Sequence, residues 1–357
     1  MPENPRENRE RPVRVALLGQ PNVGKSSLFS RLTGVGVISS NYPGTTVSFD
    51  EGAITRNGRT VTVRDLPGTY SISGNSDDER VVLKNLMEEE FDCVVLVADA
   101  ASLSGSLVLC IEAMELGIPT ILALNKIDAA RRDFDIDAEK LGSLLGTKVV
   151  FVSSKTSEGV DALADAICAG EAVLSPLKIS YDAGIEAGIA CVSDALPEHL
   201  PFSRRGIALK ILEGTTEFDS YADANLVSSA DSIEKLYEKT EGRTMAVSIA
   251  TARYTFAESV CRESVRRIER KQTFSERLSD ILITPRYGLP ILAAVCLAIL
   301  AIVIYGGAFL DSIVSGAYDA TVGDSLIRLG ADIGGKFGEA VFTGIDGSFR
   351  AILGLVI

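Results

Sequence analysis

The stretch VRVALLGQPNVGKSSLF, residues 13–29, decides the fold of this 357-residue chain. Its first seven residues form a continuous apolar run, which is typical of a strand covered on both faces. The segment GQPNVGKS (19–26) fits the pattern G-x-x-x-x-G-K-[ST], and a helical pattern begins near Lys25. A strand, a glycine-rich loop and a helix in this order are the context that a phosphate-binding loop requires.

The residues of this loop have distinct expected roles. Glycines let backbone N–H groups turn toward phosphate oxygens. Lys25 brings a positive charge to the β- and γ-phosphates, and the Ser26 hydroxyl is a ligand for Mg²⁺. The helix N-terminus adds the positive end of its dipole. We therefore predict nucleotide contacts from a continuous set: Gly19, Gln20, Pro21, Asn22, Val23, Gly24, Lys25, Ser26 and Ser27.

A second motif, DLPG (65–68), ends another apolar run. In nucleotide hydrolases such an aspartate, here Asp65, holds Mg²⁺, usually through water, and Gly68 donates its N–H to the γ-phosphate. Thr69 follows, where many GTPases carry the glutamine that positions water. Because the threonine side chain is too short for that role, we expect slow intrinsic hydrolysis or another catalytic device.

A third motif, NKID (125–128), is the N-K-x-D pattern of GTP-binding proteins. Asp128 can accept hydrogen bonds from N1–H and N2–H₂ of guanine, a pairing that adenine does not offer. The segment SSK (153–155) resembles the S-A-K loop, in which a backbone N–H recognises guanine O6. The predicted base-binding residues are Asn125, Lys126, Asp128, Ser153, Ser154 and Lys155.

Strand-like and helical patterns alternate through the N-terminal part, which predicts an α/β fold with a doubly wound, mainly parallel sheet. Further apolar runs lie at 61–68, 93–100, 120–128 and 148–154, and helical patterns at 25–33, 77–90 and 104–116. We place the GTP-binding domain at 13–172. Residues 1–12 are charged and Pro-rich, without the apolar core of a signal peptide, and are expected to be a disordered tail.

The pattern changes after residue 172, where helical periodicity dominates, for example over 244–271. This indicates an all-α domain at 173–284. Between Arg286 and Asp311, 24 residues carry no charge, whereas a bilayer core needs about 20. We therefore predict a transmembrane helix at 285–311.

Charges on either side of that segment predict its orientation. Residues 262–286 hold seven Lys or Arg, whereas three aspartates precede the first base, Arg328, on the other side. Positive flanks face the cytoplasm, so the GTP-binding domain is expected to be cytoplasmic, at the cell membrane. The remaining segment, 312–357, is Gly-rich and expected outside. It ends as though a further apolar segment had begun, so we interpret the chain as cut short.

Composition limits the remaining possibilities. The net charge of −13 and the pI near 4.8 argue against nucleic acid as the main partner, because a phosphate backbone attracts basic surfaces. The six cysteines are scattered without a C-x-x-C pair, which disfavours a zinc or redox motif.

Several stretches closely resemble the ferrous iron transport protein B (FeoB) family, from residue 13 to about 310. Soluble GTPases have no counterpart of the segment leading into the membrane helix, so its similarity is the most specific. The similar stretches are GQPNVGKSSLFSRLTG (19–34), NYPGTTV (41–47), DLPGTYS (65–71), IALKILEG (207–214), ARYTFAESV (252–260) and SERLSDILITPRYGLPI (275–291).

The resemblance implies a GTP-binding and GTP-hydrolysing cytoplasmic part of a membrane Fe²⁺ transporter, whose nucleotide state gates or regulates uptake. In NYPGTTV both Thr45 and Thr46 could close over the γ-phosphate through Mg²⁺, and the resemblance selects Thr46. The helical domain would restrain GDP release. Asn22 is either a ligand for K⁺ that stimulates hydrolysis or a residue that shapes the loop. The implied catalytic residues are Lys25, Asn22, Thr46 and Gly68, and the implied Mg²⁺ ligands are Ser26, Thr46 and Asp65.

The chain also departs from this family, because one membrane helix cannot form a pore and residues after 284 offer few Cys, His or Met ligands for iron. Cys296 lies mid-helix and is interpreted as packing. The chain is then a fragment or one part of a split transporter, with a small cytoplasmic accessory protein or a second copy as a further partner. Two alternatives stay open: a membrane-tethered regulatory GTPase without transport, and a ribosome- or tRNA-class GTPase, which the acidic charge disfavours.

Overall fold

The computed structural model describes residues 13–34, 38–41, 48–56, 58–268 and 274–356. Its packing divides the chain into two units, Met1–Glu269 and Arg270–Ile357, and each is described by itself. The predicted disordered tail and the two candidate threonines, Thr45 and Thr46, lie outside the described residues.

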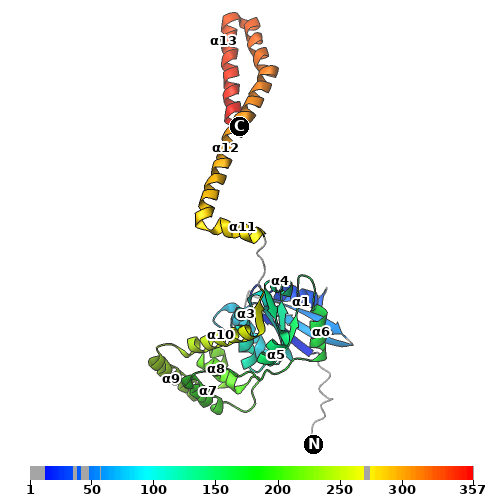
Figure 1. Cartoon of the computed structure of the whole chain (residues 1–357), viewed down its shortest axis with the longest axis vertical. Coiled ribbons are helices and arrows are strands. Elements are labelled where there is room, and N and C mark those ends of the chain that lie inside the picture. The colour runs from blue at the N-terminus through cyan, green and yellow to red at the C-terminus, as the bar shows by residue number, and fades with distance from the viewer. Residues whose placement is uncertain (1–12, 35–37, 42–47, 57, 269–273, 357) are drawn as a thin grey trace. The chain divides into compact units, whose positions relative to one another are not determined.

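A seven-stranded sheet forms the centre of the first unit, in the order β2-β3-β4-β1-β5-β6-β8. Figure 1 shows the strands of this unit as arrows among its helices. Strand β1 is parallel to β4 and β5, β5 is parallel to β6, and β6 is parallel to β8. The predicted mainly parallel sheet is confirmed, with an antiparallel edge made of β2 and β3. The strands are β1 Val13–Gly19, β2 Ile38–Asn41, β3 Ser48–Arg56, β4 Arg59–Asp65, β5 Cys93–Asp99, β6 Thr120–Asn125 and β8 Lys148–Phe151.

The strand registers bring the sequence motifs to one edge of the sheet. Asp65 at the end of β4 lies opposite Leu17 of β1, and Asp99 at the end of β5 lies opposite Asn125 of β6. The strand order reverses at β1, which has β4 on one side and β5 on the other. Ligands of doubly wound sheets bind outside the carboxyl ends of the strands at such a reversal.

Alternating side chains of β1 supply two hydrophobic cores, one on each face of the sheet. Val15 and Leu17 join the core under α1 and α6, whereas Ala16 and Leu18 join the core under α2, α3 and α5. These helices are α1 Lys25–Thr33, α2 Asp77–Glu88, α3 Leu103–Glu115, α5 Ala138–Leu145 and α6 Val160–Ala169, with short turns of helix at η1 Ala100–Ser102 and α4 Ile127–Ala130.

Four helices follow the sheet, as the helical periodicity predicts, and extend the second of these cores. They are α7 Ala183–Ala195, α8 Arg204–Leu212, α9 Ala224–Glu241 and α10 Met245–Ser264, with a 3₁₀ turn, η2, at Thr216–Tyr221. Each α-helix begins after an aspartate, serine or threonine whose side chain accepts an N–H from the first turn, which satisfies an otherwise unpaired donor. Helix α10 packs against α3 and α5, so this helical region is continuous with the sheet domain.

Strands outside the predicted apolar runs correct the sequence prediction. The helical pattern over 244–271 is wrong at Val265–Arg267, because these residues form β9 and pair antiparallel with β7 (Phe134–Ile136). The N–H of Asp137 also donates to Ser264 O at 2.9 Å. The predicted apolar runs also omit β3, where only alternate residues are buried.

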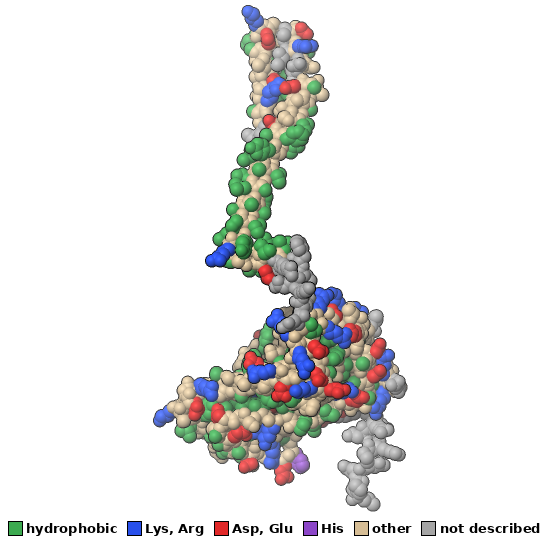
Figure 2. Space-filling view, in the orientation of Figure 1, with side chains coloured by type: hydrophobic (Ala, Val, Ile, Leu, Met, Phe, Trp, Pro, Cys, Tyr) green, Lys and Arg blue, Asp and Glu red, His purple; other side chains and the backbone are tan. Residues whose placement is uncertain are grey.

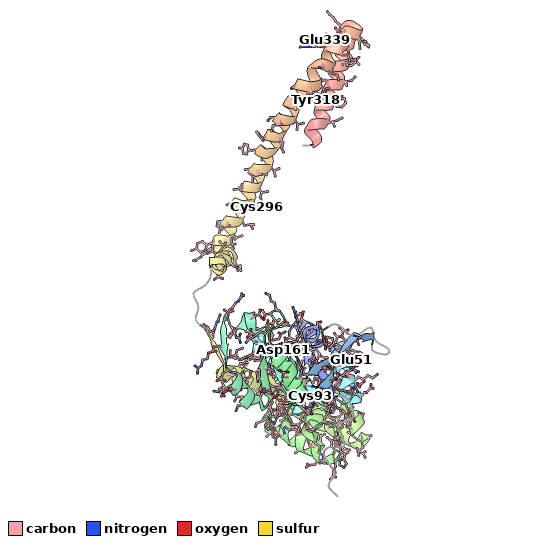
Figure 3. The ribbon with its side chains drawn as sticks, turned by 90° about the vertical axis from the view of Figure 1, so that its right-hand side faces the viewer. Glu51, Cys93, Asp161, Cys296, Tyr318 and Glu339 are labelled. Carbon is pink, nitrogen blue, oxygen red and sulfur yellow. The ribbon has the colours of Figure 1, made fainter. Side chains whose placement is uncertain are left out.

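The second unit holds α11 Phe274–Ile283, α12 Pro285–Tyr318, a π-helical turn Asp319–Gly323 and α13 Asp324–Val356. Among the described residues, one helical segment, Pro285–Val322, is long and apolar enough to cross a membrane. Figure 2 shows hydrophobic side chains along α12, and Cys296 is exposed on it (Figure 3). The helix runs past residue 311, the predicted end of the span. The Gly-rich segment after it is mostly helical, with a break at Gly335, where φ is 56°.

Candidate nucleotide-binding site

The phosphate-binding loop joins β1 to α1 through two residues in the left-handed backbone region. Gly24, directly before α1, has φ 86°, and Asn22 has φ 65°. A Cβ atom on Gly24 would lie 2.4 Å from Asn125 Nδ2. Only glycine therefore fits this position, because it combines positive φ with a close approach of a neighbouring side chain.

This loop lines a cavity of about 400 Å³ at the carboxyl edge of the sheet, a size common for ligand pockets. The predicted loop residues Gly19 and Val23 are buried and are not among the residues that line it. Asp78 from the first turn of α2 also reaches the cavity, and the sequence analysis did not predict this residue. The lining residues are Gln20, Pro21, Asn22, Gly24, Lys25, Ser26, Ser27, Gly68 and Asp78.

The groups expected to meet phosphate and Mg²⁺ lie together at one end of the loop. Lys25 Nζ forms an ion pair with Asp65 Oδ1, and both side chains are buried. Ser26 is exposed in the first turn of α1, where the helix dipole favours an anion. A carboxylate and a hydroxyl are the hard oxygen donors that suit Mg²⁺, so these residues fit the ion that the sequence predicts.

Asn125 joins the phosphate-binding loop to the segment 153–155. Its Nδ2 donates to Val23 O at 2.8 Å and to Ser154 Oγ at 3.2 Å, and its Oδ1 accepts from Ser154 N at 2.9 Å. The side chain is fully buried. One residue of the N-K-x-D motif thus sets the distance between the phosphate and base parts of the site.

The other two motif side chains point to different partners. Ser153 Oγ donates to Asp128 Oδ1 at 2.7 Å, which orients a half-buried carboxylate. Lys126 Nζ donates to the backbone oxygen of Asn22 at 2.6 Å and to Asp99 Oδ2 at 2.7 Å. Asp99 is a second residue that the sequence analysis missed, although it ends an apolar run at the same edge as the motifs. Its position at a strand end is a signal that could have found it.

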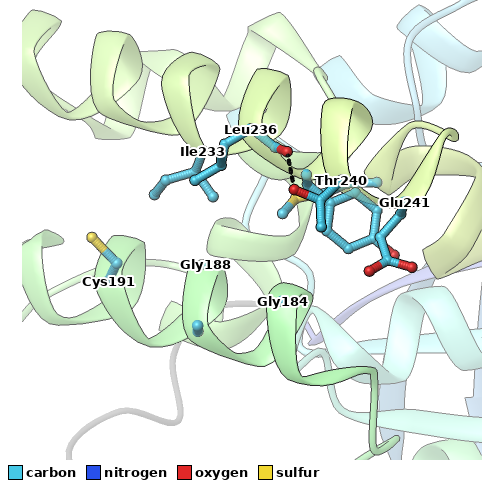
Figure 4. Close-up of a pocket in the computed structure, with 10 residues that line it drawn as sticks. Gly184, Gly188, Cys191, Ile233, Leu236, Thr240 and Glu241 are labelled. Atoms are coloured by element: carbon cyan, nitrogen blue, oxygen red, sulfur yellow. Dashed lines mark hydrogen bonds between the residues drawn. The ribbon is translucent and has the colours of Figure 1, made fainter.

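A second cavity of about 440 Å³ lies between α7 and α9 (Figure 4). Its walls are mostly apolar, and the hydroxyl of Thr240 is engaged with Leu236 O at 2.9 Å. The only charged group among the described lining residues is Glu241. A carboxylate without a compensating cation does not favour a phosphate chain, so this cavity is no alternative nucleotide site.

Comparison with known proteins shows to which family the chain belongs. Residues 13–167 match the family described as Ferrous iron transport protein B, and residues 181–266 match the FeoB cytosolic helical domain. The chain belongs to the ferrous iron transport protein B family. FeoB relatives cover both the site and the helices that follow it.

Among curated FeoB relatives, the Fe(2+) transporter FeoB of Salmonella typhimurium strain LT2 is 33% identical over 284 residues, or 78% of this chain and 36% of that protein. The Fe(2+) transport protein A/Fe(2+) transporter FeoB fusion protein of Porphyromonas gingivalis is 30% identical over 297 residues, 78% of this chain and 35% of that protein. The chain thus spans about a third of the length of these FeoB relatives.

Solved FeoB structures resemble the first unit. The cytosolic domain of T. maritima FeoB in its apo form is 35% identical with a TM-score of 0.63, over 72% of this chain and 100% of that one. The same FeoB domain in its GMPPNP form is 33% identical with a TM-score of 0.61, over 71% and 99%.

Proposed function

We propose that this chain binds GTP and hydrolyses it to GDP and phosphate, as the cytoplasmic part of a ferrous iron transporter in the cell membrane. The observation that carries the proposal is the common edge of the sheet. There Lys25 of the phosphate-binding loop pairs with Asp65, and Asn125 of the predicted base-binding set donates to Val23 O of the same loop. The GDP and GMPPNP forms of the T. maritima domain support a guanine nucleotide.

In this proposal the loop N–H groups and Lys25 bind the β- and γ-phosphates, and Asp128 selects guanine. Ser26 and Asp65 would hold Mg²⁺ together with Thr46, which lies outside the described residues. When bound, the ion neutralises charge on the phosphate oxygens. Gly68, which lines the cavity, would donate its N–H to the γ-phosphate.

We propose slow intrinsic hydrolysis, and the hydrogen bond made by the Thr69 hydroxyl supports this. Thr69 is 2% exposed, and its hydroxyl donates to Ser71 O at 2.7 Å, so it is engaged away from the cavity. The Asn22 side chain is exposed in the cavity, and its backbone is held by Lys126. We propose that its amide oxygen binds K⁺, because a cation beside the phosphates stabilises charge that develops during hydrolysis.

We further propose that α12 crosses the membrane with the nucleotide site in the cytoplasm, and that nucleotide state gates or regulates Fe²⁺ uptake. The basic residues before α12 and the names of the Fe(2+) transporter relatives support this. The fusion protein of P. gingivalis supports a small cytoplasmic accessory partner, and a second copy is a further proposed partner. The proposed domain limits remain 13–172, 173–284, 285–311 and 312–357.

Two measurements test the proposal. Lys25→Ala or Ser26→Ala should abolish Mg²⁺-dependent GTP binding and phosphate release while leaving the circular dichroism spectrum unchanged, because both side chains face the cavity. Lys140→Ala, at an exposed lysine of α5, is the matched control. If both site variants hydrolyse GTP at the control rate, the phosphate-binding assignment is wrong.

The second measurement concerns the membrane. Reporter fusions after Lys271 and after Asp324, on opposite sides of α12, should report opposite sides of the membrane. Reporters on one side would reject the proposed crossing.

A further inference from the structure

Five charged side chains form a buried cluster where α3 meets α8 and α10. Glu112 of α3 pairs with Lys210 of α8, and these residues are 2% and 1% exposed. Arg253 of α10 places Nε 2.8 Å from Glu115 Oε2 and also pairs with Glu213. Lys210 Nζ lies 3.0 Å from Glu213 Oε2. The cluster therefore joins the sheet domain to the helical region through charge.

The cluster keeps Glu112 ionised. Burial alone would raise the pKa of Glu112, but the charges of Lys210 and Arg253, with hydrogen bonds from Lys210 and Ile72, hold that pKa below its ordinary range. Buried ion pairs are often no more stabilising than apolar packing of the same volume. We therefore expect this cluster, which lies between the sheet domain and the helical region, to have a role other than stabilising the fold.

Both carboxylate oxygens of Glu112 also reach the segment that follows the DLPG motif. Ser71 Oγ donates to Glu112 Oε1 at 3.0 Å, and Ile72 N donates to Oε2 at 3.1 Å. The other end of this segment is tied to the phosphate-binding loop, because Thr69 N donates to Gly19 O at 3.2 Å. The segment 68–72 thus contacts the phosphate-binding loop at one end and Glu112 at the other. The charge of Glu112 is compensated by Lys210 and Arg253 of the helical region.

We propose that Glu112 is a positioning residue for GTP hydrolysis, because it holds segment 68–72 against the phosphate-binding loop. Lys210 and Arg253 compensate the charge of Glu112, so the position of this segment depends on the helical region. The inference rests on the proposed function, in which Gly68 contacts the γ-phosphate. Coupling of this kind is reciprocal. A γ-phosphate that moves Gly68 also changes the contacts of Glu112, and with them the contacts of α8 and α10.

Ser71→Ala in the full chain tests the contact from the nucleotide side. It removes one hydrogen bond to a charged group, so we expect kcat for GTP hydrolysis to fall about fivefold to tenfold with KM within about twofold. Ser73→Ala is the matched control, because the Ser73 hydroxyl donates instead to Glu79 Oε2 at 2.7 Å. This control should stay within about twofold of the wild type.

Lys210→Met tests the contact from the helical side, and it should lower kcat in the same way. The double variant with Ser71→Ala should lose less than the product of the two single effects, since both act through Glu112. Tyr237→Phe is the control, because its hydroxyl bonds Asp182 at 2.6 Å within the helical region.

Three outcomes separate the two proposals. A kcat of Ser71→Ala equal to that of Ser73→Ala overturns the positioning role, even if Lys210→Met fails to fold. Independent effects in the double variant overturn the path through Glu112. A wild-type chain that does not hydrolyse GTP overturns the proposed function itself.

Discussion

Replacing Asn125 with alanine should separate the phosphate part of the site from its base part. The Asn125 side chain makes three hydrogen bonds, to Val23 O, Ser154 Oγ and Ser154 N, and is fully buried. Alanine at this position removes all three and leaves a buried carbonyl and a backbone N–H without these partners.

The size of the effect follows from those bonds. At about 1 kcal/mol net for each hydrogen bond, the loss is about 3 kcal/mol. If half of it appears in nucleotide affinity, the Kd for GDP rises at least about tenfold, since 1.4 kcal/mol corresponds to a factor of ten. The remaining half lowers the free energy of unfolding of the nucleotide-free chain.

The assay is titration with a fluorescent GDP analogue, together with urea unfolding without nucleotide. The control is Asn85→Ala, because Asn85 is also fully buried but bonds Val81 O and Arg64, and none of these three residues lines the cavity. Both variants should be less stable, and only Asn125→Ala should lose affinity. Equal GDP affinities of the two variants would refute the reasoning.

Three further predictions address specificity, cation dependence and pH. Asp128→Asn should weaken GDP binding and favour a xanthine nucleotide, measured by competition, because the amide donates where the carboxylate accepts. GTP hydrolysis should be faster in KCl than in NaCl, and Asn22→Ala should remove the difference; equal rates in a GTP-binding wild type would leave the cation role without support. Because the pKa of Glu112 is lowered by folding, its ionised form stabilises the chain above the ordinary glutamate pKa of 4.5. That stabilisation is lost as the pH falls through the lower folded-state pKa. Urea unfolding from about pH 6 to about pH 3 should therefore show a smaller loss of stability in Glu112→Gln than in the wild type, and equal losses would contradict the assignment.

The sequence predicted the elements that carry strong local patterns. Helix α1 spans Lys25–Thr33 as predicted, because a glycine in the left-handed region ends the loop and an apolar face begins at once. The strands of the parallel core were also predictable, since burial on both faces leaves an unbroken apolar run. In β3, by contrast, Gly52 and Ile54 are buried while their neighbours are partly or fully exposed, so no run appears.

Structures that depend on distant partners were not predictable from local pattern. Strand β9 has only three residues, and its extended backbone comes from pairing with β7, about 130 residues earlier in the chain. Glu112 and Lys210 are charged residues in helices, a type that ordinarily faces solvent. Only the meeting of α3 with α8 and α10 shows that they are buried and compensated. The base-binding set, in contrast, is predicted from motif spacing. The structure brings Asn125 to Ser154 and Asp128 to Ser153, and the contact of these residues with guanine stays a prediction.

The two ends of the helical region are each fixed to the sheet domain. At the entrance, Thr120 of β6 exchanges backbone hydrogen bonds with Val173, and at the exit β9 pairs with β7. Between these two ends, α10 also packs against α3 and α5, so the region is held along its length. The last strand of the first unit, β9, is fixed by its pairing with β7. The chain therefore continues toward residue 274 from a point that is tied to the sheet domain, whatever moves within α8 and α9.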